Sequence, residues 1–108
     1  MESGVRRVLH ELMTSKRPKA ASVPLEDNER VRITEWRFPP GAETGWHRHE
    51  LDYVIVYRTA AKHLVETLEG GIMVDVNEGH SYFRKAGVEH NVVNAGDNEV
   101  VLVETEIK

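Results

Sequence analysis

Residues 41–53 read GAETGWHRHELDY, and this stretch decides how the rest of the chain is interpreted. It contains two histidines, His47 and His49, that are separated by a single residue. Side chains alternate between the two faces of a β-strand, so these imidazoles project side by side from one face, as a metal ion requires. Taken alone, the same spacing also fits two exposed polar histidines in a loop. The interpretation as a metal site therefore depends on a further ligand elsewhere in the chain.

A second stretch, residues 79–94, reads GHSYFRKAGVEHNVVN and contains a third histidine. His90 follows a glycine turn and precedes another β-rich run, although a lone histidine flanked by valines is more often a packed core residue. Three neutral imidazoles with open coordination positions suit zinc or another first-row divalent ion. The chain has no cysteine, so a disulfide framework and thiolate ligation are excluded. Any metal here must use histidine and carboxylate ligands.

The chain around these two stretches is a succession of short β-rich runs. Turn residues recur about every 8–12 residues, which is the pattern of an all-β sandwich or barrel. Residues 59–70 also carry helical spacing, but both neighbours are strands and the glycine pair fits a hairpin, so we interpret this segment as a turn plus a strand. The expected strands cover residues 31–38, 52–57, 64–68, 72–76, 81–84, 91–93 and 100–103.

The N-terminal residues differ from the rest of the chain. Apolar residues at helical spacing predict one short amphipathic helix, and the basic stretch 16–19, which contains a proline, ends it. We assign residues 1–22 to an N-terminal extension and residues 23–108 to the main domain. The apolar positions of the predicted helix are Val5, Val8, Leu9, Leu12 and Met13.

Size and composition limit the classes of function. The 108 residues form one domain, and 40% hydrophobic with 30% charged residues is an ordinary balance for a soluble globular protein. A formal net charge of −4 argues against a nucleic-acid partner, because phosphate binding needs a clustered positive surface. No apolar stretch reaches the length of a membrane span or forms a secretory signal. We therefore expect no membrane partner and a cytoplasmic location.

Together, the two histidine-bearing stretches resemble the sequence motifs of the cupin superfamily. The first cupin motif is G-x5-H-x-H-x3–4-E-x6-G, and the chain matches its first three positions. The second motif is G-x5-P-x-G-x2-H-x3-N, and the chain matches its glycines, histidine and asparagine. The resemblance implies a double-stranded β-helix, or jelly-roll barrel, of the small single-domain bacterial type. It also implies one divalent metal ion inside the barrel mouth. The matching residues are Gly41, His47 and His49 in the first motif and Gly79, Gly87, His90 and Asn94 in the second.

The chain departs from the cupin pattern at three positions. Ala60 replaces the closing glycine and Lys85 replaces the proline, and both are structural positions. Tyr53 stands where the usual glutamate ligand would be, on the strand face shared with the two histidines, while Asp52 points to the other face unless a β-bulge changes the phase. A phenol with a pKa near 10 is a poor metal ligand at neutral pH. We therefore expect Tyr53 to act beside the metal as a catalytic hydrogen-bond donor to bound water or substrate.

Other polar residues receive more modest interpretations. Arg84 could bind the carboxylate of an anionic substrate, although an exposed arginine is the commoner case. Glu43 could act as an acid or base near the barrel mouth, but this is the less favoured interpretation. His10 and His63 are expected to be solvated, and His80 is expected in a surface turn more than in a pocket.

The sequence favours two classes of function. The first is a metal-dependent enzyme, with a dioxygenase acting on a small organic acid or thiol as the concrete hypothesis. Three-histidine iron sites are known in the thiol dioxygenase branch of cupins, so loss of the glutamate does not exclude oxygen chemistry. Resemblance to small bacterial cupins of β-alanine breakdown implies an amino-acid catabolic setting. The second is a non-catalytic, metal-dependent protein that binds or senses a small molecule. The metal is iron, nickel, zinc or manganese, since three histidines do not select among them. Resemblance to small cupins also implies a homodimer.

Overall fold

The computed structural model describes residues 16–108, and in this part of the chain every regular element is a β-strand. The expected all-β class is confirmed. The helix predicted over residues 5–13 lies outside the described residues, and no helix able to cross a membrane occurs within them. The strands are β1 (Ala21–Asp27), β2 (Val31–Phe38), β3 (His47–Arg48), β4 (Asp52–Tyr57), β5 (Ala61–Thr67), β6 (Gly70–Val76), β7 (Ser81–Arg84), β8 (Glu89–Asn94) and β9 (Val100–Ile107).

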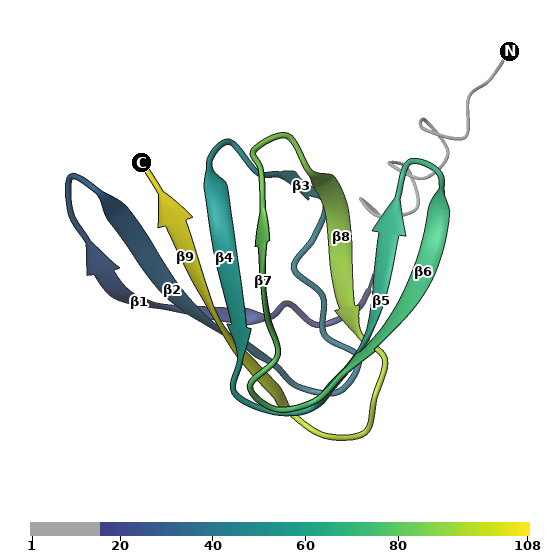
Figure 1. Ribbon diagram of the computed structural model, residues 1–108. Helices are drawn as coiled ribbons and strands as arrows, with labels where there is room; N and C mark the ends of the chain where they lie inside the picture. The colour runs from purple at the N-terminus through teal and green to yellow at the C-terminus, as the bar shows by residue number, and fades with distance from the viewer. Residues whose placement is uncertain (1–15) are drawn as a thin grey trace, which may run out of the picture.

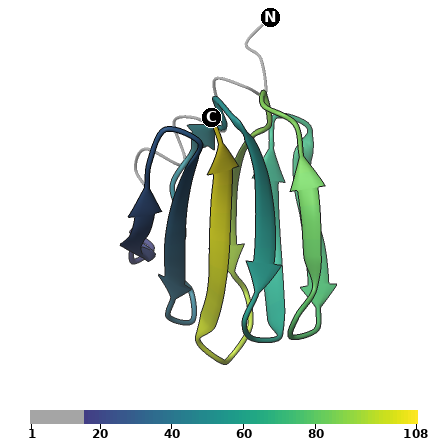
Figure 2. The same ribbon diagram turned by 60° about the vertical axis from the view of Figure 1, so that its left-hand side comes forward.

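The strands form two antiparallel sheets that face each other. One sheet has the order β1-β2-β9-β4-β7 and the other has the order β3-β8-β5-β6. Figure 1 shows the sheets as two walls that approach each other at one end and diverge toward the end where β3 lies. Figure 2 shows the five-stranded sheet, with the yellow β9 between β2 and β4. The predicted domain boundary between residues 22 and 23 falls inside β1.

The central strands follow the period of two that a half-buried strand requires. In β4, Tyr53, Ile55 and Tyr57 are buried, while Val54 and Val56 between them are less buried. The buried residues pack with Phe38 of β2 and with Val100 and Leu102 of β9. This alternation places one side of every central strand toward the space between the sheets.

The segment that could also be read as a helix is a hairpin, as the sequence predicted. β5 and β6 pair in register from Ala61 opposite Val76 to Thr67 opposite Gly70, which leaves a two-residue turn. The Thr67 hydroxyl donates to the carbonyl oxygen of Gly70 at 2.9 Å and closes this turn. The hairpin therefore extends the four-stranded sheet by one strand.

Two glycines of the sequence motifs are required by backbone conformation. Gly41 has φ of +83° and Gly79 has φ of +87°, in the left-handed region that side chains with a Cβ atom rarely adopt. The N–H of Gly41 donates to the carbonyl oxygen of Asn94, and the N–H of Gly79 donates to the carbonyl oxygen of Tyr57. Each of these glycines lies in a turn between two strands. These glycines thus set the turns that precede the two histidine-bearing segments.

A buried polar cluster fixes the loop that leads to His47. The Asn91 amide oxygen accepts the Gly45 N–H at 2.8 Å, and its nitrogen donates to Glu43 at 3.0 Å and to Glu66 at 2.9 Å. Arg17 donates to the same two carboxylates. Burial alone would raise the pKa of Glu43, but hydrogen bonds from Asn91 and Arg17, with nearby positive charge, lower it overall. Glu43 therefore stabilises this loop as a carboxylate and does not line the barrel cavity.

We predict that Asn91→Ala lowers the free energy of unfolding by about 3 kcal/mol, because it leaves the Gly45 N–H without its partner and removes one hydrogen bond from each of two carboxylates. Urea denaturation monitored by circular dichroism measures this change. Asn77→Ala, at an exposed position in the β6–β7 turn, is the matched control and is expected to change stability by less than about 0.5 kcal/mol. Equal stability of the two variants would contradict the role assigned to the cluster.

Candidate metal centre

The two sheets enclose a cavity of about 700 Å³ that is lined by residues of both. Alternate residues of the central strands face it, as the strand period requires. Much of the lining is apolar, and three histidines, His47, His49 and His90, form a polar group within it. Apolar members of the lining include Trp36, Phe38, Ile55, Val74, Val92 and Leu102.

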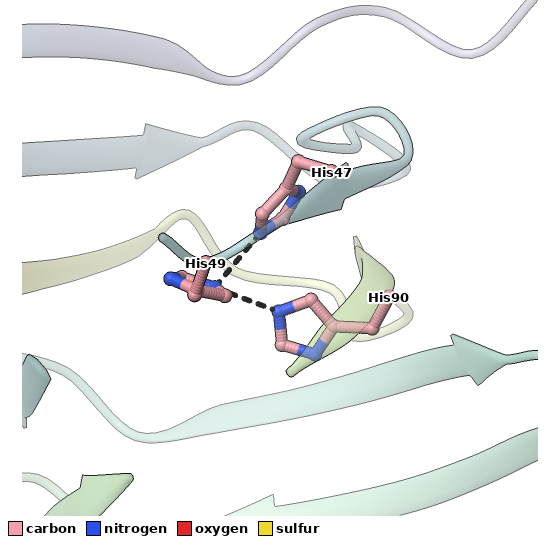
Figure 3. Close-up of side chains that lie close together, drawn as sticks. All are labelled: His47, His49 and His90. Carbon is pink, nitrogen blue, oxygen red and sulfur yellow. Dashed lines mark hydrogen bonds between the residues drawn. The ribbon is translucent and has the colours of Figure 1, made fainter. Parts of the chain in front are cut away.

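The three histidines come from two paired strands and the residue that follows one of them. His47 of β3 lies directly opposite His90 of β8 in the strand register, and His49 follows β3 by one residue. Figure 3 shows their ring nitrogens pointing toward one another. The Nε2 atom of His49 lies 3.0 Å from Nε2 of His47 and 3.1 Å from Nε2 of His90. Histidines separated by about forty residues are therefore brought together at one point, as the sequence motifs implied.

The hydrogen-bond partners of the rings determine where their protons lie. Nδ1 of His47 is 2.8 Å from the carbonyl oxygen of Gly45, which can only accept, so His47 carries its proton on Nδ1 and presents a lone pair at Nε2. Nδ1 of His49 faces a carboxylate oxygen of Glu104 at 3.5 Å, which favours the same tautomer. Two Nε2 lone pairs would then face each other at 3.0 Å. Such an arrangement is stable when a cation lies between them.

The histidines are poised to bind a cation at neutral pH. Burial, followed by the charge of His47, lowers the pKa of His49 to about 4. Burial, followed by the charges of the other two histidines, lowers the pKa of His90 to about 3. Neutral imidazole is the form that binds metals, and the lowered pKa values keep the rings of His49 and His90 neutral at pH 7.

The donor set fits a first-row divalent ion. With metal–nitrogen bonds of about 2.1 Å, neighbouring ligand atoms lie about 3.0 Å apart in octahedral geometry and about 3.4 Å apart in tetrahedral geometry. The separations of 3.0 and 3.1 Å from His49 to His47 and to His90 agree with neighbouring positions of one coordination sphere, and all three ligand atoms lie within 4.8 Å of one another. His47, His49 and His90 could therefore hold one metal ion and leave its remaining positions open toward the cavity.

Tyr53 lies beside the histidines rather than among them. Its ring stacks on His49, with ring centroids 3.9 Å apart and an angle of 13° between the planes. No group in the described part of the chain hydrogen-bonds its hydroxyl, and burial raises the pKa of Tyr53, so the phenol stays protonated. Asp52 points away from the cavity and accepts the Ala86 N–H at 2.8 Å. The sequence left undecided whether Tyr53 or Asp52 faces the metal site, and in the structure Tyr53 faces the cavity.

Glu104 is a site residue that the sequence reasoning missed. It is buried on β9, where its second carboxylate oxygen accepts the indole N–H of Trp36 at 3.2 Å. Burial raises the pKa of Glu104. The available signal was strand phase, since Glu104 follows Val100 and Leu102 on the same face of β9 and all three are buried. A carboxylate buried beside apolar residues indicates a specific partner, which here is His49.

The prediction that His63 is solvated is wrong. The side chain is about 1% exposed, and its Nδ1 atom lies 3.1 Å from the Tyr57 hydroxyl. Burial lowers the pKa of His63 to about 4, so the ring is neutral at pH 7. Its Nε2 atom has no hydrogen-bond partner in the described part of the chain. The prediction failed because it took no account of strand phase, by which His63 shares the cavity face of β5 with Val65.

Fold and site together define a class of protein: a jelly-roll barrel with three convergent histidines inside its mouth. Comparison with family models gives the same class, because the cupin domain model matches residues 34–106. The chain therefore belongs to the cupin family. The expected cupin family and the expected jelly-roll fold are confirmed.

Individual relatives place the chain among small bacterial cupins. It is 57% identical over 94 residues to the β-alanine degradation protein BauB of Pseudomonas aeruginosa. This alignment covers 87% of this chain and 99% of BauB. A cupin domain protein of Bordetella pertussis is 56% identical, with a TM-score of 0.83 over 87% of this chain and 98% of that structure. The polyketide cyclase RemF of Streptomyces resistomycificus shares the fold at 20% identity, with a TM-score of 0.67 over 86% of this chain and 70% of that one.

We predict that Glu104→Gln weakens zinc binding by about 10-fold or more, because a carboxylate that orients a metal-ligating histidine typically contributes this much to affinity. Competition with a chromophoric chelator measures the affinity. Glu35→Gln is the matched control, because Glu35 is also buried but pairs with Arg37 and Arg58 outside the cavity. Equal zinc affinity of the two variants would show that Glu104 does not support the site.

We predict that metal-free His63→Phe protein is less sensitive to acid than the wild type. The folded-state pKa of His63, about 4, lies below its unfolded value of about 6.5, so the stability due to its neutral form is complete above pH 6.5 and is lost as the pH falls toward 4. This loss amounts to about 3 kcal/mol in the wild type and is absent from the variant. Urea unfolding between pH 7 and pH 4 measures it. Parallel pH profiles for the two proteins would contradict the assignment.

Proposed function

We propose that the protein is a metal-dependent enzyme that acts on a small organic acid or thiol in amino-acid breakdown, with a dioxygenase as the concrete hypothesis. The observation that carries the proposal is the convergence of three histidines inside a cavity of about 700 Å³, where Nε2 of His49 lies 3.0 Å from Nε2 of His47 and 3.1 Å from Nε2 of His90. The name of the relative BauB, which refers to β-alanine degradation, supports the catabolic setting.

A bound first-row divalent ion would supply Lewis-acid chemistry and, for iron, redox chemistry. The protein's own residues supply the rest of the site. His47, His49 and His90 would hold the ion through imidazole nitrogens, which carry no negative charge, so a bound ion would keep its full charge for an anionic ligand. Tyr53 presents a protonated hydroxyl that donates a hydrogen bond to a water or substrate atom beside the ion.

The apolar cavity lining sets the size and the environment of the substrate. A volume of about 700 Å³ is within the range of small-molecule sites. Apolar walls exclude water and strengthen the electrostatic interactions made at the histidines and at Tyr53. These features support a small metabolite as the partner. The homodimer and the cytoplasmic location stay predictions.

We predict that tag-free wild-type protein contains close to one metal ion per chain, and that His47→Ala and His90→Ala each lose it while remaining folded. Inductively coupled plasma mass spectrometry measures the content. His80→Ala is the control, because His80 lines the same cavity but lies outside the cluster of three histidines. The iron(II)-loaded wild type is expected to consume oxygen in the presence of a small organic acid or thiol. His47→Ala and His90→Ala are expected to consume none.

Wild-type protein that refuses added iron, zinc and nickel would overturn the metal proposal. A metal-loaded protein that returns its bound ligand unchanged, with no product by mass spectrometry across acids, thiols and diketones, would overturn the enzyme proposal. That second outcome would favour the non-catalytic binding protein.

A further inference from the structure

A row of polar side chains crosses the larger sheet at the level of Tyr53. Arg84 of β7 and Glu106 of β9 are the direct cross-strand partners of Tyr53, on either side of it. Arg32 of β2 is the partner of Glu106. All four residues line the cavity that contains the three histidines. The order Arg84, Tyr53, Glu106, Arg32 thus runs across four neighbouring strands of one wall.

The charges in this row do not cancel. Arg32 lies 3.7 Å from Glu106 and neutralises it. Arg84 has no carboxylate within 4.0 Å among the described residues; it lies over the ring of Tyr82 at 4.5 Å and donates one hydrogen bond to the carbonyl oxygen of Phe83. The cation–π contact holds the guanidinium in place without neutralising it, so the remaining N–H donors stay available. Within this row, the positive charge of Arg84 is therefore the one that no carboxylate of the row neutralises.

Tyr53 adds a neutral donor next to that charge. Directly opposite residues of an antiparallel pair have Cβ atoms about 5 Å apart, so Tyr53 and Arg84 are immediate neighbours. Burial is the main cause that raises the pKa of the Tyr53 phenol, Tyr82 and Glu104 raise it further, and the positive charge of Arg84 opposes them. The hydroxyl makes no hydrogen bond within the described residues, while the Tyr53 ring is fixed by stacking on His49. A tyrosine and an arginine that are direct cross-strand partners thus line the cavity together, and the tyrosine ring stacks on one of the three histidines.

We propose that Tyr53 and Arg84 together bind the carboxylate of a small organic acid in the cavity. A planar guanidinium matches the geometry of a carboxylate, and the phenol supplies a further hydrogen bond to it. One uncompensated positive charge suits a group with a single negative charge better than a dianion such as phosphate. This inference deepens the proposed function, on which its biological meaning rests, by naming the substrate class and the end of the molecule that is recognised.

The position of the carboxylate would determine which part of the substrate approaches the histidines. The Tyr53 ring stacks on His49, and Arg84 is the cross-strand partner of Tyr53, so a carboxylate bound by these two residues would lie beside the histidine cluster. The remainder of the acid then occupies the apolar part of the cavity or extends to the histidines. Tyr53 and Arg84 bind one end of the molecule and leave the three histidines free for another group.

Propionate and its neutral isostere propionamide test the proposal on metal-free and on zinc-loaded protein, by NMR titration of the ligand and of the arginine Nε–H signals. We expect the wild type to bind propionate and to bind propionamide far more weakly. Arg84→Gln is expected to weaken propionate binding by about 10-fold or more, and Tyr53→Phe by about 3-fold or more, with propionamide unaffected. Arg48→Gln is the matched control, because Arg48 also lines the cavity and also lacks an ion pair within the described residues. It removes the same charge and is expected to change the affinity by less than about 2-fold.

Equal losses in Arg84→Gln and Arg48→Gln would overturn the proposal, since they would reflect net charge alone. Propionamide binding as tightly as propionate, or no saturable propionate binding to either form of the wild type, would also overturn it. Propionate binding that needs zinc and is insensitive to Arg84→Gln would place the carboxylate on the metal instead, which overturns this inference but supports the metal site. Binding to metal-free protein that depends on Arg84 supports the inference even where metal loading fails, so the two proposals can fail separately.

Discussion

The structure depends on one electrostatic constraint: three imidazole rings converge inside a barrel, with ligand nitrogens all within 4.8 Å of one another. Two of them carry their protons on the far side of the ring, as the contacts of His47 with Gly45 and of His49 with Glu104 indicate. Lone pairs in this arrangement repel one another unless a cation joins them. The surrounding structure must therefore hold the rings in place, and it does so through strand pairing behind them and hydrogen bonds to the loop before them.

Asn91 shows how closely folding and site geometry are linked. The residue adjacent to His90 binds the backbone of Gly45, two residues before His47, so one buried side chain connects the two histidine-bearing segments. Asn94, at the end of the same strand, donates to the carbonyl oxygens of Phe38 and Asn98 and accepts the Gly96 N–H. Both amides are fully buried and well satisfied. Asn91 and Asn94 thus stabilise the fold around the histidines through hydrogen bonds to the backbone.

Negative charge is arranged around the site in an unusual way for a cupin. Tyr53 stands where the motif has a glutamate, so the candidate ligands are all neutral. Glu104 lies behind His49 on another strand, and Glu106 is paired with Arg32. A carboxylate placed behind a ligand orients the ring without occupying a metal position. The open side of the site consequently faces Tyr53 and Arg84, a donor and a cation, and this electrostatic arrangement suits an anionic ligand.

The sequence by itself determined the fold class and the three histidines. Alternating apolar residues and regularly spaced turns specify strands because side chains in a strand alternate with a period of two, and H-x-H on a strand places both rings on one face. The glycines at 41 and 79 could be recognised because only a residue without a Cβ atom adopts those turn conformations freely. These properties are local, so they can be read along the chain.

Only the tertiary structure decided which polar residues lie near the histidines. Glu104 is more than fifty residues from His49 in sequence, and the row of Arg84, Tyr53, Glu106 and Arg32 exists only because β7, β4, β9 and β2 are neighbours in one sheet. Its order depends on strand pairing between distant segments, which no local pattern specifies. For His63, strand phase gave the inner face of β5, and the enclosure of that face then required the four-stranded sheet to pack against its partner.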